Sequence, residues 1–323
     1  MTDIARAAEL LRAGELVAFP TETVYGLGAD AANPLAVAKI FAAKGRPQDH
    51  PLIVHLADAK QLDRWARDIP DAARKLAAAF WPGPLTLILK RQPDVIDAIT
   101  GGQDSVGLRV PNHPLALELL RTFGGADGGG LAAPSANRFG RISPTTAEHV
   151  REELGDAVAM VLDGGACQVG IESTILDLSG DEPAILRPGM ISVDAIAAVL
   201  GQAPAAAGRA PGPNTPRVPG SLDSHYAPQT PLELVSSDGL VFAVRNAIIK
   251  QERTAFLASM AQPIHHEMIS WRLAPADPEP FARALYASLR ELDALGCARI
   301  IVQAPPATPG WLPVLDRLRR AAG

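Results

Sequence analysis

The sequence predicts an α/β protein of two domains. The chain has 323 residues, which exceeds the size at which a single hydrophobic core usually stops growing. Short runs of branched apolar residues alternate with helical stretches, which is typical of a mixed sheet covered by helices. A segment crowded with Pro, Gly and Ala at 201–231 interrupts this alternation and favours an extended, fairly stiff connector. We therefore expect a first domain at 1–205, a connector at 206–231 and a small α/β domain at 232–323.

The first domain begins with helix and strand signals. Residues 2–13 have an amphipathic helical pattern closed by Gly14, and "ELVAF" at 15–19 has the composition of a strand. The run "NPLAVAKIFAAKG" at 33–45 predicts a helix with Asn33 as N-cap and Gly45 just beyond its end. Further strands are expected at "PLIVHL" (51–56), "LTLILK" (85–90), "SVGLRV" (105–110), "GLAAP" (130–134), "AMVLD" (159–163), "STILDL" (173–178) and "AILRP" (184–188).

The last ninety residues contain a second, shorter alternation. We expect a strand at "LVFAV" (240–244), a helix near 245–260, a weak strand, a helix near 278–295, a strand at "ARIIVQ" (298–303) and a last helix. This order of elements predicts a small α/β domain.

Composition excludes several classes of protein. With 47% hydrophobic and 20% charged residues, the chain has the composition of a soluble globular protein, and its apolar runs are far shorter than the ~20 residues of a bilayer helix. The first residues lack the apolar block of a signal peptide, so we expect a cytoplasmic protein without membrane contact. Cys167 and Cys297 are too few for a disulfide framework or a zinc site. The net charge of -5 does not favour a stand-alone nucleic-acid binder.

The familiar phosphate-binding, dinucleotide-binding, zinc-protease and serine-hydrolase motifs are absent from the sequence. Polar residues instead gather at the ends of expected strands, where open α/β sheets bind their ligands. These groups are "PTETVYG" (20–26), "KGRPQDHPLIVH" (44–55), "SVGLRVP" (105–111), "APSANRFGRISPT" (133–145), "IESTILDL" (171–178), "ILRPG" (185–189) and "HYAP" (225–228).

Each of these positions also has a purely structural explanation. Lys44 and Arg46 follow a helix, whose carboxyl-terminal dipole favours cations. Arg109 lies within an apolar run, so its guanidinium needs an anion, either an internal Asp or the carboxylate of a ligand. The others can be explained as turn, N-cap or core residues: Ser135, Asn137, Ser143 and His55.

Together, these residues indicate a site for a polyanionic ligand. Four cations and three hydroxyls gather without an activated nucleophile among them. Such a site works by positioning and charge neutralisation, as in phosphoryl and nucleotidyl transfer. The residues are Lys44, Arg46, Arg109, Arg187, Thr21, Ser135 and Ser173.

Several motifs, in a fixed order, resemble those of the YrdC-like family of threonylcarbamoyl-AMP synthases. The matching runs are "FPTETVYGLGA", "KGRPQDHPLIVH", "VGLRVP", "APSAN" and "LRPG", and "PGSLDSHYAP" resembles the long, two-domain members. The resemblance implies a twisted mixed-sheet domain with a concave cavity and a smaller Rossmann-like domain. It implies a nucleotidyltransferase that forms threonylcarbamoyl-AMP and pyrophosphate from L-threonine, bicarbonate or CO2, and ATP. The product would pass to a tRNA threonylcarbamoyl transferase complex.

The resemblance also implies roles for particular residues. His50 departs from the family pattern, since many members have Asn there. Mg2+ is expected to accompany ATP, and we assign no ligands to it. The threonine site is expected to contain Thr21, His55, Arg109, Ala133 and Ser173. The ATP site is expected to contain Lys44, Gln48, Ser105, Ser135, Asn137, Ser143, Arg187 and Tyr226, with Lys44 and Arg46 as the catalytic cations.

The connector is expected to act as a lid over the nucleotide, with Tyr226 docking at its end. Its alternative is a passive tether whose Tyr226 packs on either domain. A rival function for the whole chain is a non-catalytic module that binds tRNA or double-stranded RNA on a concave basic face. The acidic first domain and the scarcity of aromatic residues among the cations argue against it. A purely structural scaffold would leave Arg109 and Arg187 unexplained.

Overall fold

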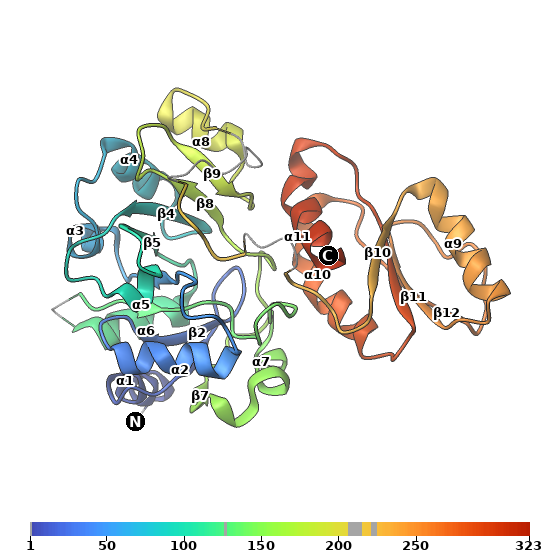
Figure 1. The fold of residues 1–323 in the computed structure, drawn as a ribbon, viewed down its shortest axis with the longest axis horizontal. Helices are drawn as coiled ribbons and strands as arrows, with labels where there is room; N and C mark the ends of the chain where they lie inside the picture. The colour runs from blue at the N-terminus through green and yellow to red at the C-terminus, as the bar shows by residue number, and fades with distance from the viewer. Residues whose placement is uncertain (1, 126–127, 206–214, 221–224) are drawn as a thin grey trace. The chain divides into compact units, whose positions relative to one another are not determined.

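The computed structural model describes residues 2–125, 128–205, 215–220 and 225–323. Part of the expected connector, 206–214 and 221–224, therefore lies outside the described residues. Within the described chain, none of the helices combines the length and the apolar character needed to cross a bilayer. The chain divides into two compact units (Figure 1). The first unit comprises Met1–Phe139, Pro144–Gln168 and Glu172–Ser221, and the second comprises Gly140–Ser143, Val169–Ile171 and Leu222–Gly323.

The first unit is built on a nine-stranded mixed sheet, with the strand order β7-β1-β2-β6-β3-β5-β4-β8-β9. The predicted mixed α/β class is confirmed. The predicted strands all form, most of them shorter than their apolar runs. β2 was not predicted. The strands are β1 (Val17–Phe19), β2 (Gly26–Asp30), β3 (Ile53–His55), β4 (Leu85–Lys90), β5 (Ser105–Arg109), β6 (Leu131–Ala132), β7 (Met160–Val161), β8 (Thr174–Asp177) and β9 (Ala184–Arg187).

Eight α-helices and two 3-10 turns are described in this unit. Helix α2 forms as predicted: the Asn33 side chain accepts hydrogen bonds from the first backbone N–H groups, and Gly45 ends the helix with a φ of 60°. The helices are α1 (Asp3–Arg12), α2 (Pro34–Lys44), α3 (Leu62–Trp65), α4 (Asp71–Phe80), α5 (Asp97–Thr100), α6 (Pro114–Gly124), α7 (Ala147–Leu154) and α8 (Val193–Leu200), with 3-10 turns at Ala59–Gln61 and Gly155–Ala157.

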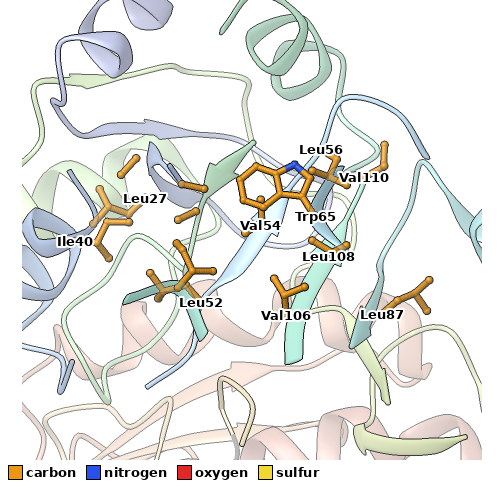
Figure 2. Close-up of a cluster of buried hydrophobic side chains, with 14 of the residues drawn as sticks. Leu27, Ile40, Leu52, Val54, Leu56, Trp65, Leu87, Val106, Leu108 and Val110 are labelled. Carbon is orange, nitrogen blue, oxygen red and sulfur yellow. The ribbon is translucent and has the colours of Figure 1, made fainter. Parts of the chain in front are cut away.

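The side chains of the central strands alternate between two faces of the sheet. Val106 and Leu108 of β5 belong to the large core, beside Val54 of β3 (Figure 2). Successive side chains of a strand point to opposite faces, so Ser105 and Arg109 belong to the other face. A side chain at Gly107 would contact β3 and β4 residues on that same face. In β5 the alternation therefore places Val106 and Leu108 in the large core and Ser105 and Arg109 on the opposite face.

The second unit contains a four-stranded parallel sheet in the order β10-β13-β11-β12. α10 and α11 lie against one side of this sheet and α9 against the other (Figure 1). The predicted strand at 240–244 is wrong, because these residues lie within α9. The strand before that helix, β10, was missed. The elements are β10 (Leu232–Val235), α9 (Ser237–Ile249), β11 (Thr254–Ala258), β12 (Ile269–Leu273), α10 (Pro278–Asp293), β13 (Arg299–Gln303), a 3-10 turn (Pro309–Trp311) and α11 (Leu312–Ala322).

Candidate active site

Strand pairing gathers four of the expected site residues at one edge of the large sheet. β3 and β5 are parallel, and His55 is the register partner of Arg109 at their carboxyl ends. β4 and β8 are also parallel to each other, so Ser173, directly before β8, lies at their amino ends. β9 runs antiparallel to β8, and Arg187 pairs with Ile175. Four residues that are far apart in sequence thus end at the same edge.

Arg109 has a buried anionic partner in the first unit. Its Nη2 lies 2.8 Å from Oε1 of Glu22, and its Nε donates to the carbonyl oxygen of Gly83 over 3.4 Å. Both charged residues are buried, with 4% of Arg109 and 3% of Glu22 exposed. Of the two alternatives stated for Arg109, an internal carboxylate is therefore present. This carboxylate belongs to Glu22 of the "PTETVYG" run, which was not among the expected site residues.

His55 lies beside this ion pair as a neutral imidazole. Its burial, with the nearby charge of Arg109, lowers the pKa of His55 to about 3. Its ring also meets the ring of Phe19 edge-on, with centroids 6.1 Å apart. Near neutral pH, His55 can therefore act as a hydrogen-bonding group and not as a cation. Next to the same pair, burial, with the charge of Glu22 adding to it, raises the pKa of the Cys167 thiol to about 12.

The hydroxyl of Thr21 organises the loop between β1 and β2. It donates to the carbonyl oxygen of Val24 over 2.6 Å and lies 2.8 Å from the hydroxyl of Thr23. It also accepts hydrogen bonds from the backbone N–H groups of Thr23 and Val24 at 3.1 and 3.2 Å. Thr21 and Thr23 are both buried. The hydroxyl-rich run thus forms a tight, internally bonded loop that carries Glu22.

Ser173 and Arg187 are directly bonded. Nε and Nη2 of Arg187 donate to the carbonyl oxygen of Ser173 at 3.1 and 2.9 Å, and Nη2 is also 3.1 Å from its hydroxyl. That hydroxyl lies 2.7 Å from the hydroxyl of Thr86 on β4. Nη1 of Arg187 donates to the carbonyl oxygen of Pro219 over 3.0 Å. One guanidinium thus joins the start of β8 to the described part of the connector.

Lys44, at the end of α2, reaches a different loop. Its Nζ donates to the carbonyl oxygens of Ser135 and Asn137, both at 2.5 Å. Lys44 is buried, and this burial, with the nearby charge of Arg46, lowers its pKa well below the usual value. Arg46 donates to the carbonyl oxygen of Pro51 over 2.9 Å. Lys44 therefore does more than complement the helix dipole, because it fixes the loop that carries the expected residues 135 and 137.

Ser105 lines a small pocket on the face of the sheet opposite the large core. Residues 217–219 of the connector also line it. The pocket is lined by Pro51, Leu52, Ile53, Ile88, Gln103, Ser105, Gly107, Arg217, Val218 and Pro219.

The remaining expected residues lie in varied surroundings. Ala133 is buried and its backbone N–H donates to the carbonyl oxygen of Ile53 over 3.0 Å, whereas Gln48 is exposed. The ring of His50 meets that of Phe139 edge-on at 5.3 Å, and burial lowers its pKa.

Ser143 and Tyr226 belong to the second unit. Ser143 is buried but is not the N-cap of α7, because Thr146 caps that helix. Tyr226 is buried with a φ of 64°, and its ring stacks on that of Tyr286 at 5.7 Å beneath the guanidinium of Arg317 at 5.4 Å. Tyr226 therefore packs within the second unit.

The described residues contain no group of three or more His, Cys, Asp or Glu side chains that could hold a metal ion. Mg2+ binds mainly to substrate phosphates and water in many nucleotide-using enzymes and needs few protein ligands there. A magnesium ion could accordingly enter with ATP, but these residues do not form a metal site of their own.

Comparison with known proteins covers nearly the whole chain. Residues 9–189 match the family model described as "Telomere recombination" (Sua5, YciO and YrdC), and residues 191–323 match the model described as "Threonylcarbamoyl-AMP synthase, C-terminal domain". The threonylcarbamoyl-AMP synthase of Bacillus subtilis is 42% identical over 325 residues, which cover 99% of this chain and 93% of that protein. The synthase of Pyrococcus abyssi is 39% identical over 322 residues, 98% of this chain and 93% of that protein.

A solved structure agrees with these matches. The structure of P. abyssi Sua5 complexed with L-threonine superposes with a TM-score of 0.88 at 37% sequence identity, covering 99% of this chain and 94% of that one. Both units therefore have counterparts in one solved two-domain protein. The resemblance found in the sequence motifs is confirmed, and the chain belongs to the Sua5 family of two-domain threonylcarbamoyl-AMP synthases.

Proposed function

We infer that this protein forms threonylcarbamoyl-AMP and pyrophosphate from L-threonine, bicarbonate or CO2, and ATP, for the threonylcarbamoyl-adenosine modification of tRNA. The match over 99% of the chain to the B. subtilis threonylcarbamoyl-AMP synthase, at 42% identity, carries this conclusion. The reaction transfers a nucleotidyl group. It therefore requires an anion-binding site that positions its substrates, and the cations at the sheet edge supply positive charge for one.

The threonine site is proposed around Arg109. A guanidinium suits the carboxylate of an amino acid, because it is always charged and donates charge-assisted hydrogen bonds. Neutral His55, as the register partner of Arg109, can hydrogen-bond to the substrate without adding charge. The relative solved with L-threonine supports a threonine site in this fold. The proposed residues are Thr21, His55, Arg109, Ala133 and Ser173.

The nucleotide site is proposed around the other cations. Lys44 and Arg46 are the proposed catalytic groups, because negative charge builds on the α-phosphate during transfer. The Lys44–Ser135–Asn137 hydrogen bonds support a common site for these three residues. The proposed ATP-binding residues are Lys44, Gln48, Ser105, Ser135, Asn137, Ser143, Arg187 and Tyr226.

The chemistry follows from the charges of the reactants. The ammonium group of threonine loses a proton, and the free amine forms an N–C bond with CO2 and releases a second proton, which gives a carbamate anion. From bicarbonate the same carbamate forms as a C–O bond breaks and water leaves. A carbamate oxygen then forms a bond to the α-phosphorus of ATP, while the bond from that phosphorus to the pyrophosphate oxygen breaks. Two anions must meet in this step, so neighbouring cations lower its barrier. Mg2+, bound through the phosphates of ATP, would supply further positive charge.

We also propose the wider setting of the reaction. The unstable product would be handed to a tRNA threonylcarbamoyl transferase complex, with weak tRNA contact by this protein and a cytoplasmic location, where ATP and tRNA occur. The connector is proposed as a lid, because excluding water protects an acyl phosphate intermediate from hydrolysis. The Arg187–Pro219 hydrogen bond supports contact between the connector and an expected nucleotide-binding residue.

The test of the function is an assay of pyrophosphate release from ATP. We expect release to require both L-threonine and bicarbonate, and threonylcarbamoyl-AMP to be detected by mass spectrometry. Release that is independent of threonine would contradict the proposed reaction. Binding of tRNA with no turnover under the same conditions would instead favour the RNA-binding module.

A further inference from the structure

We propose that Glu22 is a positioning residue that fixes the guanidinium of Arg109 for the carboxylate of L-threonine. This inference rests on the proposed function, and it assigns a role to a residue outside the expected threonine and ATP sites. Its basis is the geometry of the buried pair in the first unit and the loop that carries Glu22.

The Glu22–Arg109 pair is isolated from water. Both oxygens of Glu22 and the Nη2 atom of Arg109 are fully buried, and Nη2 lies 2.8 Å from Oε1. Among the described residues, Arg109 is the cation within ion-pair distance of Glu22, and neither Glu22 oxygen accepts a well-formed hydrogen bond. A buried carboxylate without a cation is strongly unfavourable. The two side chains therefore depend on each other.

Two contacts determine the plane of the Arg109 guanidinium. Nε donates to the carbonyl oxygen of Gly83, and Nη2 faces Glu22. Within the described chain, Nη1 has no such partner. A planar group held at two of its three nitrogens cannot rotate freely, so its third nitrogen points in a fixed direction. This arrangement leaves Nη1 for a substrate carboxylate.

The loop around Glu22 explains how a single carboxylate can be held so firmly. The hydroxyl of Thr21, directly before Glu22, bonds to backbone atoms of Thr23 and Val24, which follow it. These bonds fix the backbone on either side of Glu22 without using the Glu22 side chain itself. The Thr21 hydroxyl thus fixes the backbone that carries the Glu22 carboxylate, and the carboxylate in turn fixes the guanidinium of Arg109.

An alternative role for Glu22 predicts the opposite effect of its removal on threonine binding. If Glu22 were only a stand-in for the substrate carboxylate, threonine would have to displace it, and its removal would tighten binding. If Glu22 positions Arg109, its removal leaves a guanidinium free to rotate and weakens binding. Complete burial of both Glu22 oxygens favours positioning, because a displaceable group needs somewhere to move.

The test compares Glu22→Gln with the unmodified chain by calorimetric titration with L-threonine. We expect threonine affinity to fall about ten- to a hundredfold, the range of a lost charge-assisted interaction. ATP affinity is expected to change less than threefold. The control is Asp177→Asn, which removes another buried carboxylate, bonded to Ser179, and should leave threonine affinity unchanged.

A double-mutant cycle separates positioning from a general structural role. If Glu22 acts through Arg109, then Glu22→Gln should have little further effect on threonine affinity in the Arg109→Lys background. Additive losses would overturn the inference, and so would unchanged or tighter binding by Glu22→Gln alone. Should Glu22→Gln fail to fold, Glu22→Asp keeps the charge but shortens the reach, and an unchanged affinity there would also overturn it. If the unmodified chain binds no L-threonine, it is the proposed function that fails.

Discussion

The guanidinium of Arg187 donates to both oxygens of Ser173, at 2.9 Å to the carbonyl and 3.1 Å to the hydroxyl. The proposed roles assign Arg187 to ATP and Ser173 to threonine. A direct bond between the two residues therefore provides a physical link between the two substrate sites, because a change in one residue alters the position of the other.

This link predicts that Arg187→Lys affects both substrates. Lysine keeps the charge but has a single nitrogen, so it cannot reproduce the donation from both Nε and Nη2. We expect ATP affinity to fall about tenfold and threonine affinity, measured without ATP, to fall roughly threefold or more. Calorimetry with each substrate alone checks this. Arg74→Lys, at an exposed arginine paired with Asp63, is the control. An Arg187→Lys variant with normal threonine affinity would argue against the link.

Lys44→Ala is predicted to impair turnover more than threonine binding. If Lys44 neutralises charge that builds in the transition state, kcat should fall by at least about tenfold, with a smaller rise in the KM for threonine. Stability should also fall by about 1–3 kcal/mol, because two carbonyl groups lose their donor. Steady-state kinetics and thermal melting check both expectations.

The control for Lys44 is Lys39→Ala, at an exposed lysine of the same helix that pairs with Glu15. It should change neither kcat nor stability appreciably. Normal turnover by Lys44→Ala, with only a lower melting temperature, would reduce Lys44 to a structural role in fixing residues 135–137.

His55 is predicted to make stability depend on pH. Its pKa is about 3 in the folded state, against about 6.5 for an unperturbed histidine. Between these values the unfolded chain binds a proton that the folded chain does not, so the free energy of unfolding falls as pH falls. From pH 7 to pH 5 this amounts to about 2 kcal/mol. His55→Gln should lose less stability over that interval, as measured by guanidinium denaturation.

The comparison for His55 is the difference in pH dependence between the variant and the unmodified chain, since other groups contribute equally to both. His265→Gln, at an exposed histidine, serves as the control and should leave the dependence unchanged. Equal losses in His55→Gln and the unmodified chain would mean that His55 is not held neutral by its surroundings.

Local sequence signals predicted most of the fold. The N-cap and the terminal glycine determine the ends of α2, and apolar runs predicted the strands of the sheet. β2 was missed because "GLGAD" has two glycines and no β-branched residue, and its pairing with β1 and β6 decides its structure. α9 was mistaken for a strand because "LVFAV" is rich in residues that favour strands, while Ser236 in fact caps a helix.

The site was predictable in part. Arg109 stood out as a charge within an apolar run, but its neighbours depend on strand register, which one sequence does not reveal. His55 and Arg109 are neighbours because β3 and β5 pair in parallel, although 53 positions separate them in the sequence. Glu22 could have been found from its place in a run of hydroxyls, since a carboxylate there is available to balance a buried arginine.

Residues 215–220 of the connector belong to the first unit and are held there by an exchange of hydrogen bonds. The backbone N–H of Arg217 donates to Oε1 of Gln103 over 2.6 Å, and Nε2 of Gln103 donates back to the carbonyl oxygen of Arg217 over 3.1 Å. Next to this contact, Val218 is buried in a cluster with Ile53 and Ile88. Gln103 thus holds the connector against the pocket that Ser105 lines.

If the connector is a lid, Gln103→Ala should weaken the binding of a non-hydrolysable ATP analogue in the presence of threonine. The two hydrogen bonds to the connector are lost, along with one from Nε2 to the carbonyl oxygen of Thr100, so we expect a fall of roughly five- to thirtyfold. The binding of threonine alone should not change, because the hydrogen bonds of Gln103 within the described residues reach Thr100 and Arg217 and not the proposed threonine site. Gln92→Ala, which removes two hydrogen bonds from another side-chain amide to backbone carbonyls of the first unit, is the matched control. A passive tether would leave nucleotide affinity the same in both variants, and that result would rule out the lid.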